Sequence, residues 1–297
     1  MKILVTGGTI FASRYVAEYY VHKHDMVFCL NRGNNPPSEN TTLIKADRNN
    51  LGDSLKDMHF DTVLDITAYT DEHINSLLDS GITFDSYVMI SSSAVYPETL
   101  PRPFKETYPV GENKIWGAYG TNKIAAENAL LQRVPNAYII RPPYLYGDMN
   151  NLYRESFVFD CAMQERKFYI PQNNIKLQFF YIGDLCRFID KILEIQPKQH
   201  IFNVGNKDCI TIAEWVKLCY QAVGKTAELA YVTNGDEQRN YFCFYDYEYS
   251  LDVEKQYQIM SDTTNLLDGL KSSFAWYKNN PSLVRKKDYI HYIDQNF

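Results

Sequence analysis

Short apolar runs recur through the first half of the chain, with longer amphipathic stretches between them. The runs lie at residues 2–6, 26–30, 42–45, 62–66, 87–91 and 138–140, and most are continuous rather than alternating. Continuous runs of this length are typical of strands that are covered on both faces. Helical spacing appears at residues 12–23, 72–79 and 120–132. The alternation of strand and helix predicts an α/β fold with a doubly wound parallel sheet of the Rossmann type.

The alternation of apolar runs and amphipathic stretches becomes less regular after Gly147, and residues 226–252 are rich in Tyr, Asn, Asp and Glu with little periodicity. We therefore expect one domain over residues 1–150, joined by a strand and helix that return near residues 180–204. A smaller, mixed region is expected over residues 151–297. No repeat and no flexible Gly/Ser linker separates the two parts, so we expect them to pack together with a cleft between them.

Composition narrows the classes of protein. The chain has 297 residues, of which 45% are hydrophobic and 22% charged, so it is expected to fold. Its net charge of −6 argues against a nucleic-acid partner. The start MKILVTGG has no leader pattern and no apolar stretch is long enough to cross a membrane, which predicts a cytoplasmic protein without a membrane partner. The six cysteines are scattered and predict reduced thiols rather than a metal site.

The 24 tyrosines are an unusual number for this length. They are compatible with surfaces that stack on sugars, but Tyr is also tolerated at half-buried positions throughout proteins. We favour the second interpretation.

A glycine pair follows the first apolar run. The sequence over residues 6–13 is Thr-Gly-Gly-Thr-Ile-Phe-Ala-Ser, between an expected strand and an expected helix. Dinucleotide-binding turns place glycines here so that the backbone can approach a pyrophosphate at the helix N-terminus. Of the spacing Gly-x-x-Gly-x-x-Gly only Gly7 is kept, because Ile10 and Ser13 stand at the other two positions. The hypothesis is dinucleotide binding, with Ile10 crowding the phosphates, and the alternative is an ordinary loop.

The ends of the next two strands bear on the type of dinucleotide. The second run ends in Asn31 and Arg32, with no carboxylate to accept the ribose hydroxyls of NAD. Arg32 could pair with the 2′-phosphate of NADP, which favours NADP over NAD, although a solvated Arg32 or one stacked on adenine is an open alternative. Asp47, after the third run, could accept the adenine amino group or simply form a turn.

Candidate acid/base chemistry follows the fifth run. The residues 90–96 read Ile-Ser-Ser-Ser-Ala-Val-Tyr, and Tyr119 and Lys123 come later at helical i, i+4 spacing. The Lys123 ammonium could then favour the Tyr119 phenolate, while the Ser92 hydroxyl holds a substrate oxygen. A second Tyr-x-x-x-Lys pair, Tyr19 and Lys23, lies at the far end of the first helix, away from the strand ends where ligands bind. We expect a structural role for that pair.

Five blocks together, TGGTIFAS, ISSSAVY, YGTNK, RPPYLYG and QFFYIGD, resemble the extended short-chain dehydrogenase/reductase superfamily of NAD(P)-dependent nucleotide-sugar epimerases and dehydratases. The resemblance covers nearly the whole chain. The opening block and the sequence Asn-Arg-Gly at 31–33 look most like an atypical branch in which the second glycine is replaced, which also includes plastid RNA-associated proteins. The first domain would then bind the dinucleotide and the smaller region the substrate.

The resemblance implies roles for individual residues. Tyr119 would be the acid/base, Lys123 would bind the nicotinamide ribose and lower the pKa of Tyr119, and Ser92 would be the hydroxyl partner. Residues 141–143 would border the nicotinamide. The implied cofactor contacts are Gly7, Gly8, Thr9, Ile10, Phe11, Asn31, Arg32, Asp47, Arg48, Ala68, Ser91, Tyr119, Lys123 and Pro142. The implied substrate contacts are Ser92, Ser93, Tyr119 and Arg239, of which Arg239 would meet a phosphate unless it is a solvated surface residue.

One difference between this sequence and the family narrows the range of possible reactions. The family's 4,6-dehydratases carry Asp-Glu directly after the catalytic hydroxyl residue, where this chain has Ser93 and Ala94, and neither side chain can transfer the required protons. The expected function is therefore an NAD(P)-dependent epimerase or reductase acting on a nucleotide-linked sugar, with a homodimer possible through the helix that carries Tyr119. The alternative is a noncatalytic dinucleotide sensor or RNA-associated protein that has kept the fold.

Overall fold

A seven-stranded parallel sheet forms the first lobe of the computed structural model, which describes residues 1–233 and 235–297. Its order is β11-β6-β5-β4-β1-β2-β3. The strands are β1 (Lys2–Thr6), β2 (Met26–Asn31), β3 (Thr42–Lys45), β4 (His59–Asp65), β5 (Thr83–Ile90), β6 (Tyr138–Arg141) and β11 (Ile201–Asn203). All neighbours pair in parallel. The predicted Rossmann-type doubly wound sheet is confirmed.

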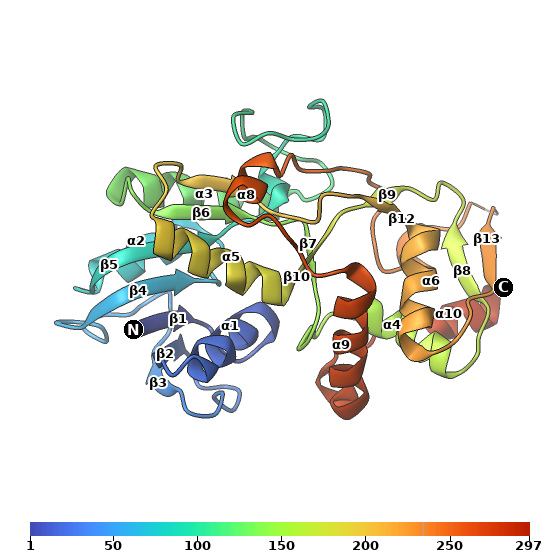
Figure 1. Cartoon of the computed structure of the whole chain (residues 1–297), viewed down its shortest axis with the longest axis horizontal. Helices are drawn as coiled ribbons and strands as arrows, with labels where there is room; N and C mark the ends of the chain where they lie inside the picture. The colour runs from blue at the N-terminus through green and yellow to red at the C-terminus, as the bar shows by residue number, and fades with distance from the viewer. Residues whose placement is uncertain (234) are drawn as a thin grey trace.

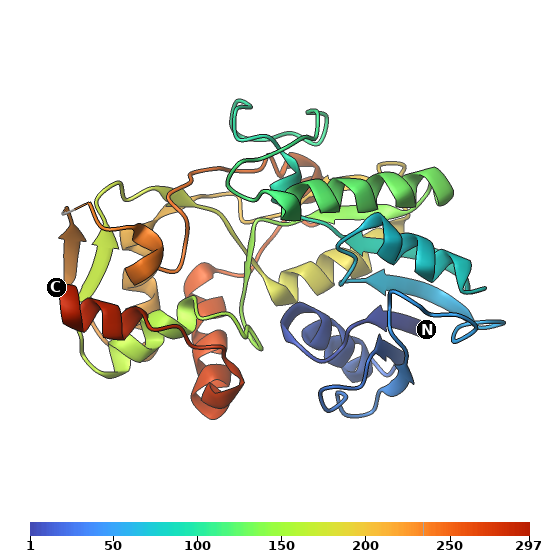
Figure 2. The same cartoon turned by 180° about the vertical axis from the view of Figure 1, so that it is seen from behind.

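Helices cover both faces of this sheet. Helices α1 (Phe11–His22) and α5 (Ile182–Ile195) lie in front of it in Figure 1. Helices α2 (Asp71–Asp79) and α3 (Ala118–Arg133) cover the other face, which Figure 2 shows from behind. Two apolar clusters, one on each side of the sheet, account for the continuous apolar strands seen in the sequence. The strand order reverses between β1 and β4, and ligands of such sheets bind at the carboxyl ends beside this reversal.

The second lobe lies to the right in Figure 1 and is built from short elements. Its helices are α4 (Glu155–Met163), α6 (Ile212–Val223), α7 (Gln238–Tyr241), α9 (Leu266–Asn279) and α10 (Tyr289–Asn296). Its strands form three pairs, β7 (Tyr144–Tyr146) with β10 (Phe179–Tyr181), β8 (Phe168–Pro171) with β13 (Leu229–Val232), and β9 (Lys176–Leu177) with β12 (Ile210–Thr211). Local signals are clear in α6, which begins with a capping box between Thr211 and Glu214 and ends at Gly224 with φ +81°.

Many of the tyrosines lie in the core of the second lobe. Tyr146, Tyr220 and Tyr277 are almost fully buried there, packed with phenylalanines and Trp215. The structural interpretation of the tyrosine content therefore accounts for these positions. The chain also returns to the first lobe through α8 (Glu254–Ile259), which packs against β11 and α5.

Candidate active site

The glycine turn after β1 is shaped by the strand beside it. Gly7 and Gly8 have φ of +93° and +82°, and a Cβ on Gly8 would lie 2.3 Å from the Cys29 Sγ. Only glycine fits at Gly8, because β2 packs directly against the turn. Helix α1 then begins at Phe11, with Ile10 at the N-cap and no side chain capping the first-turn amides. These amides are free to bind an anion.

Asn31, one of the predicted cofactor residues, supports the turn instead of facing outward. Its amide donates to the Gly7 carbonyl oxygen at 2.7 Å, and its Oδ1 accepts from the Gly33 amide at 2.8 Å. Arg32 beside it is exposed and makes no hydrogen bond or ion pair with the described residues. Of the two, Arg32 is the one that is free to meet a ligand.

Asp47 and Arg48 take part in contacts within the protein. The Asp47 carboxylate accepts from the Asn49 amide at 2.9 Å, which is the turn-forming alternative of the sequence analysis. Arg48 forms a bidentate ion pair with Asp65, which is fully buried, and donates to the Thr67 hydroxyl at 3.2 Å. Burial opposes ionisation of Asp65, but the Arg48 guanidinium holds the pKa of that carboxyl below its usual value. Neither Asp47 nor Arg48 lines the cavities described below.

Ser92, Tyr119 and Lys123 meet in one cavity of about 410 Å³, here called the catalytic cavity. Ser92 caps η1 (Ser93–Val95), where its hydroxyl oxygen accepts from the Ala94 amide at 3.1 Å. Tyr119 is at the start of α3, and Gly120 lets this helix approach η1, because a Cβ there would lie 2.4 Å from the Ala94 carbonyl oxygen. The three residues predicted as catalytic are therefore brought together.

The electrostatics of Tyr119 and Lys123 differ from a simple phenol–ammonium pair. The Lys123 Nζ donates to the carbonyl oxygens of Ala68 at 2.6 Å and Ile90 at 2.8 Å. Burial lowers the pKa of Lys123 to about 8. Tyr119 as a whole residue is 41% exposed, but burial of its hydroxyl by protein atoms raises the pKa of Tyr119, and hydrogen bonding by Ser92 acts in the opposite direction.

Other predicted residues line the same cavity or support it. Phe11, Ser91, Ser93 and Pro142 are part of its wall. The Ser91 hydroxyl donates to the buried Glu127, and the Ser93 hydroxyl donates to the Tyr249 hydroxyl at 3.1 Å. Sequence reasoning did not find Tyr69, Trp116, Tyr144, Arg154 and Tyr249, which also line the cavity. These residues come from five separate segments. Tyr144 lies in the RPPYLYG block but was given no role, and the other four lie outside the five blocks.

Two further cavities join the catalytic cavity. The first, the turn cavity of about 340 Å³, is lined by residues 9–11 of the glycine turn and by Arg14, Trp276 and Arg285, and it shares Phe11 with the catalytic cavity. It lies beside the uncapped start of α1. A dinucleotide running from the turn past Phe11 to Lys123 fits this arrangement.

The second, the basic pocket, has a volume of about 290 Å³ and four cationic side chains, Arg154, Arg239, Arg285 and Lys287. It shares Trp116, Tyr144, Leu152 and Arg154 with the catalytic cavity and Arg285 with the turn cavity. Among the described residues, none of the four cations has a carboxylate within ion-pair distance. The Tyr144 hydroxyl in its wall is buried and has no hydrogen-bond partner in the described part of the chain. The pocket is therefore suited to an anion.

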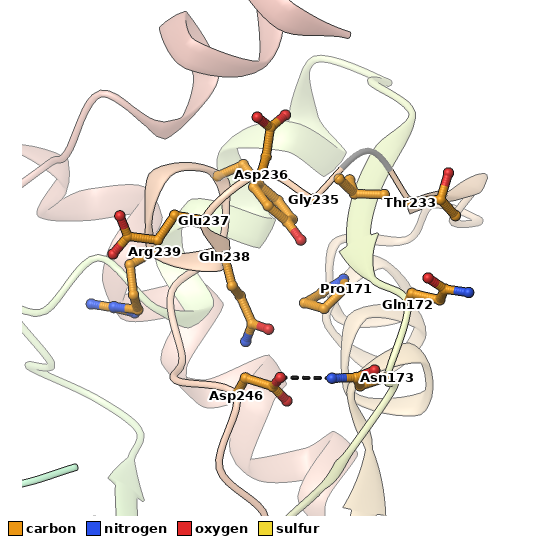
Figure 3. Close-up of a pocket in the computed structure, with 12 residues that line it drawn as sticks. Pro171, Gln172, Asn173, Thr233, Gly235, Asp236, Glu237, Gln238, Arg239 and Asp246 are labelled. Atoms are coloured by element: carbon orange, nitrogen blue, oxygen red, sulfur yellow. Dashed lines mark hydrogen bonds between the residues drawn. The ribbon is translucent and has the colours of Figure 1, made fainter. Parts of the chain in front are cut away.

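Arg239 also borders a separate outer recess of about 390 Å³, shown in Figure 3. Asp246 accepts there from the Asn173 amide at 2.6 Å, and the Arg239 side chain extends away from both residues. Its guanidinium lies 4.6 Å from the ring centroid of Tyr245, which is part of the basic pocket. The predicted phosphate contact thus lies at the basic pocket together with three cations that were not predicted.

Comparisons with known proteins bear on the family and the fold. Residues 67–205 match the model of the NAD dependent epimerase/dehydratase family. Two solved structures share the fold: MoeE5 in complex with UDP-glucose and NAD (19% identity, TM-score 0.73, 95% of this chain and 100% of the other) and UDP-glucuronic acid 4-epimerase from Bacillus cereus in complex with UDP-glucuronic acid and NAD (18% identity, TM-score 0.71, 94% and 99%). The resemblance to extended short-chain dehydrogenases/reductases is confirmed.

A curated relative belongs to a different functional class. The chloroplast stem-loop binding protein of 41 kDa b from Arabidopsis thaliana is 25% identical over 299 aligned positions, which cover 92% of this chain and 78% of the relative. The family match therefore leaves the particular reaction to be argued from the site. None of the helices that the structure describes is both long and apolar enough to cross a membrane.

Proposed function

We propose that this protein is an NAD(P)-dependent epimerase or reductase that acts at a carbinol or keto carbon of a nucleotide-linked sugar. The observation that carries the proposal is the position of the catalytic cavity, which joins the glycine turn on one side and the basic pocket on the other. A cofactor and an anionic substrate could thus both reach Tyr119.

The cofactor's chemistry would be hydride transfer at the nicotinamide when it is bound. Tyr119 would take the proton of the substrate hydroxyl as the C–H hydride leaves, and would return it to the keto oxygen in the reverse direction. The Ser92 hydroxyl would hold the same substrate oxygen and Lys123 would bind the nicotinamide ribose, which is supported by the position of both residues in the wall of the catalytic cavity. An epimerase returns the hydride to the other face of the keto carbon, whereas a reductase releases the product.

The basic pocket supports a phosphorylated substrate. Three arginines and a lysine, with no carboxylate at ion-pair distance among the described residues, line a recess that shares wall residues with the catalytic cavity, although the chain as a whole carries a charge of −6. Guanidinium groups bind phosphate oxygens through paired, charge-assisted hydrogen bonds. A nucleoside diphosphate would fill this role, with the sugar pointing into the catalytic cavity. A 4,6-dehydratase reaction is disfavoured, because the hydroxyl of Ser93 is bound to Tyr249 and Ala94 has no proton to give.

Cofactor content is the first test. The purified protein is denatured and assayed for released NAD(H) and NADP(H), and the emptied protein is then titrated with NADH and NADPH by fluorescence. Retained NAD supports an epimerase that recycles its hydride, whereas exchangeable NADPH supports a reductase. If neither dinucleotide binds, the proposed function is wrong.

Arg32 is expected to discriminate between the two dinucleotides. It is exposed and has no hydrogen-bond or ion-pair partner in the described part of the chain, so it can pair with a 2′-phosphate, whereas the Asn31 side chain is held by the turn. Arg32→Gln should weaken NADPH binding about tenfold and leave NADH binding nearly unchanged. The matched control is Arg133→Gln, an exposed arginine of α3 that pairs with Asp79 away from the glycine turn. Equal losses of affinity for NADPH and NADH would show that Arg32 does not discriminate at the ribose 2′ position.

RNA binding is a second candidate, favoured by the replacement of the second glycine by Ile10 and by the name of the plant relative. A filter-binding assay with a stem-loop RNA at low salt distinguishes it. Affinity that falls steeply with salt would support this candidate, because phosphate contacts release counterions.

The expected homodimer also stays a prediction. Exposed positions on α2 and α3 are mostly polar, among them Glu72, Asp79, Asn122 and Asn128, so this face offers little apolar area.

A further inference from the structure

We propose that Arg154 couples anion binding in the basic pocket to proton transfer at Tyr119. The inference rests on the proposed function, since it concerns how the same site is tuned by its substrate. It assigns to Arg154 an electrostatic role that neither motif nor spacing attaches to it.

Lys123 is poorly placed to be the only cation acting on Tyr119. Its ammonium group is directed at the carbonyl oxygens of Ala68 and Ile90, and its Nζ lies 4.9 Å from the centre of the Tyr69 ring. The described residues include no hydrogen bond between Lys123 and Tyr119. Its charge is therefore largely directed at the carbonyls and at Tyr69.

Arg154, unlike Lys123, carries a charge that can act on both the catalytic cavity and the basic pocket. It lies at the N-cap of α4, and its guanidinium carbon is 5.0 Å from the ring centre of Tyr144 and 5.7 Å from that of Phe244. These ring contacts hold the guanidinium without neutralising it. It lines the catalytic cavity together with Tyr119 and the basic pocket together with Arg239. Arg154 is thus the cation that both cavities share.

The groups around the Tyr119 hydroxyl come from four elements. Tyr69 follows β4, and its ring centre is 6.2 Å from that of Tyr119. Ser92 caps η1, Lys123 is one turn along α3, and Arg154 begins α4. The charge of Arg154 lowers the pKa of Tyr119, in opposition to burial and to Tyr69, and thereby favours the phenolate.

A phosphate bound in the basic pocket would cancel part of that charge. The phenol then becomes a weaker acid and keeps its proton, which is the form that donates to a keto oxygen. Linkage makes the effect reciprocal, so that ionisation of Tyr119 weakens phosphate binding by the same factor. Substrate binding would therefore favour the reducing direction, in which Tyr119 gives its proton to a keto oxygen, and would oppose its action as a base on a substrate hydroxyl.

The test uses the full-length protein with 3,5-difluorotyrosine at position 119, because fluorination lowers the pKa of a phenol and gives a single ¹⁹F signal that reports its ionisation. Arg154→Gln is expected to raise the pKa of this phenol, and Arg154→Lys to restore it in part. Arg239→Gln is the matched control, since Arg239 lines the basic pocket but not the catalytic cavity. It should leave the pKa unchanged in the absence of ligand.

UDP is the probe for the coupling. Both glutamine variants should bind UDP about tenfold more weakly in calorimetry, because each removes a charged phosphate contact. Saturating UDP should raise the pKa at position 119 in the protein with Arg154 and cause no further rise in Arg154→Gln. An unchanged pKa in Arg154→Gln, or UDP binding without a shift, would overturn the coupling. The titration needs no dinucleotide, so failure of the protein to bind NAD(P)H refutes the proposed function without deciding this inference.

Discussion

Tyr119→Phe is expected to lower kcat/KM by about a hundredfold to ten-thousandfold while leaving dinucleotide affinity unchanged. The substitution removes only the hydroxyl that would exchange a proton with the substrate. The aromatic ring, which is in contact with Tyr69, is retained. Turnover is measured with whichever dinucleotide the protein binds and a set of UDP- and dTDP-linked sugars, and affinity by fluorescence titration.

The chain provides its own control in the second Tyr-x-x-x-Lys pair. The Tyr19 hydroxyl donates to the Asp190 carboxylate at 2.6 Å, and Lys23 pairs with the same carboxylate at 2.7 Å. This cluster ties α1 to α5 and lines none of the three joined cavities. Tyr19→Phe should therefore leave kcat/KM near that of the native protein. Equal kcat/KM values for the Tyr119 and Tyr19 variants would show that Tyr119 does not transfer the proton.

The sheet could be predicted because its inner strands β1, β4, β5 and β6 are largely buried on both faces, which leaves continuous apolar runs in the sequence. The run expected at 138–140 is β6, and its neighbours differ from the expected ranges by only a few residues. The glycine turn and Tyr119 were also found, since a turn between strand and helix and an i, i+4 pair are local patterns. Such patterns depend on backbone geometry that neighbouring residues determine.

The rest of the site could not be predicted because it is assembled from distant segments. Arg154, Arg239 and Arg285 share one pocket only after the second lobe has folded. The same limitation explains Arg48, which sequence reasoning placed at the cofactor. A charged residue at a strand end is equally compatible with a ligand and with a buried partner, and here the partner is Asp65 at the end of β4. The spacing of residues along the sequence does not indicate ion pairs of this kind between the ends of separate strands.

Arg141 is a further residue at a strand end that could contact either a ligand or a buried partner within the protein. The resemblance placed residues 141–143 beside the nicotinamide, and Pro142 does line the catalytic cavity. Arg141 itself is 3% exposed and forms a bidentate ion pair with Glu127 of α3, with its Nε 3.0 Å from one carboxylate oxygen. Its Nη1 donates to the Tyr96 hydroxyl at 2.8 Å. Arg141 thus fixes α3, the helix that carries Tyr119, to β6.

Breaking this pair from one side is expected to cost about 3–5 kcal/mol of unfolding free energy, because the remaining charge stays buried without a partner. Arg141→Met leaves the Glu127 carboxylate uncompensated, and Glu127→Leu leaves the guanidinium. Each single variant should therefore shift the urea unfolding midpoint far more than Arg133→Gln, which breaks an exposed ion pair worth about 1 kcal/mol or less.

The double variant Arg141→Met/Glu127→Leu should recover a large part of this loss, because both charges are then replaced by apolar groups of similar size. Recovery will be incomplete, since the buried Ser91 hydroxyl loses its Glu127 acceptor, at a cost of about 1–3 kcal/mol. The Tyr96 hydroxyl loses the Arg141 donor but still donates to Asn203 Oδ1 at 2.8 Å. A double-mutant cycle from urea unfolding gives the coupling energy directly. Additive losses would mean that the two charges do not interact. Strong coupling would mean that this ion pair contributes to holding α3, the helix that carries Tyr119, against β6, through two residues that do not line the catalytic cavity.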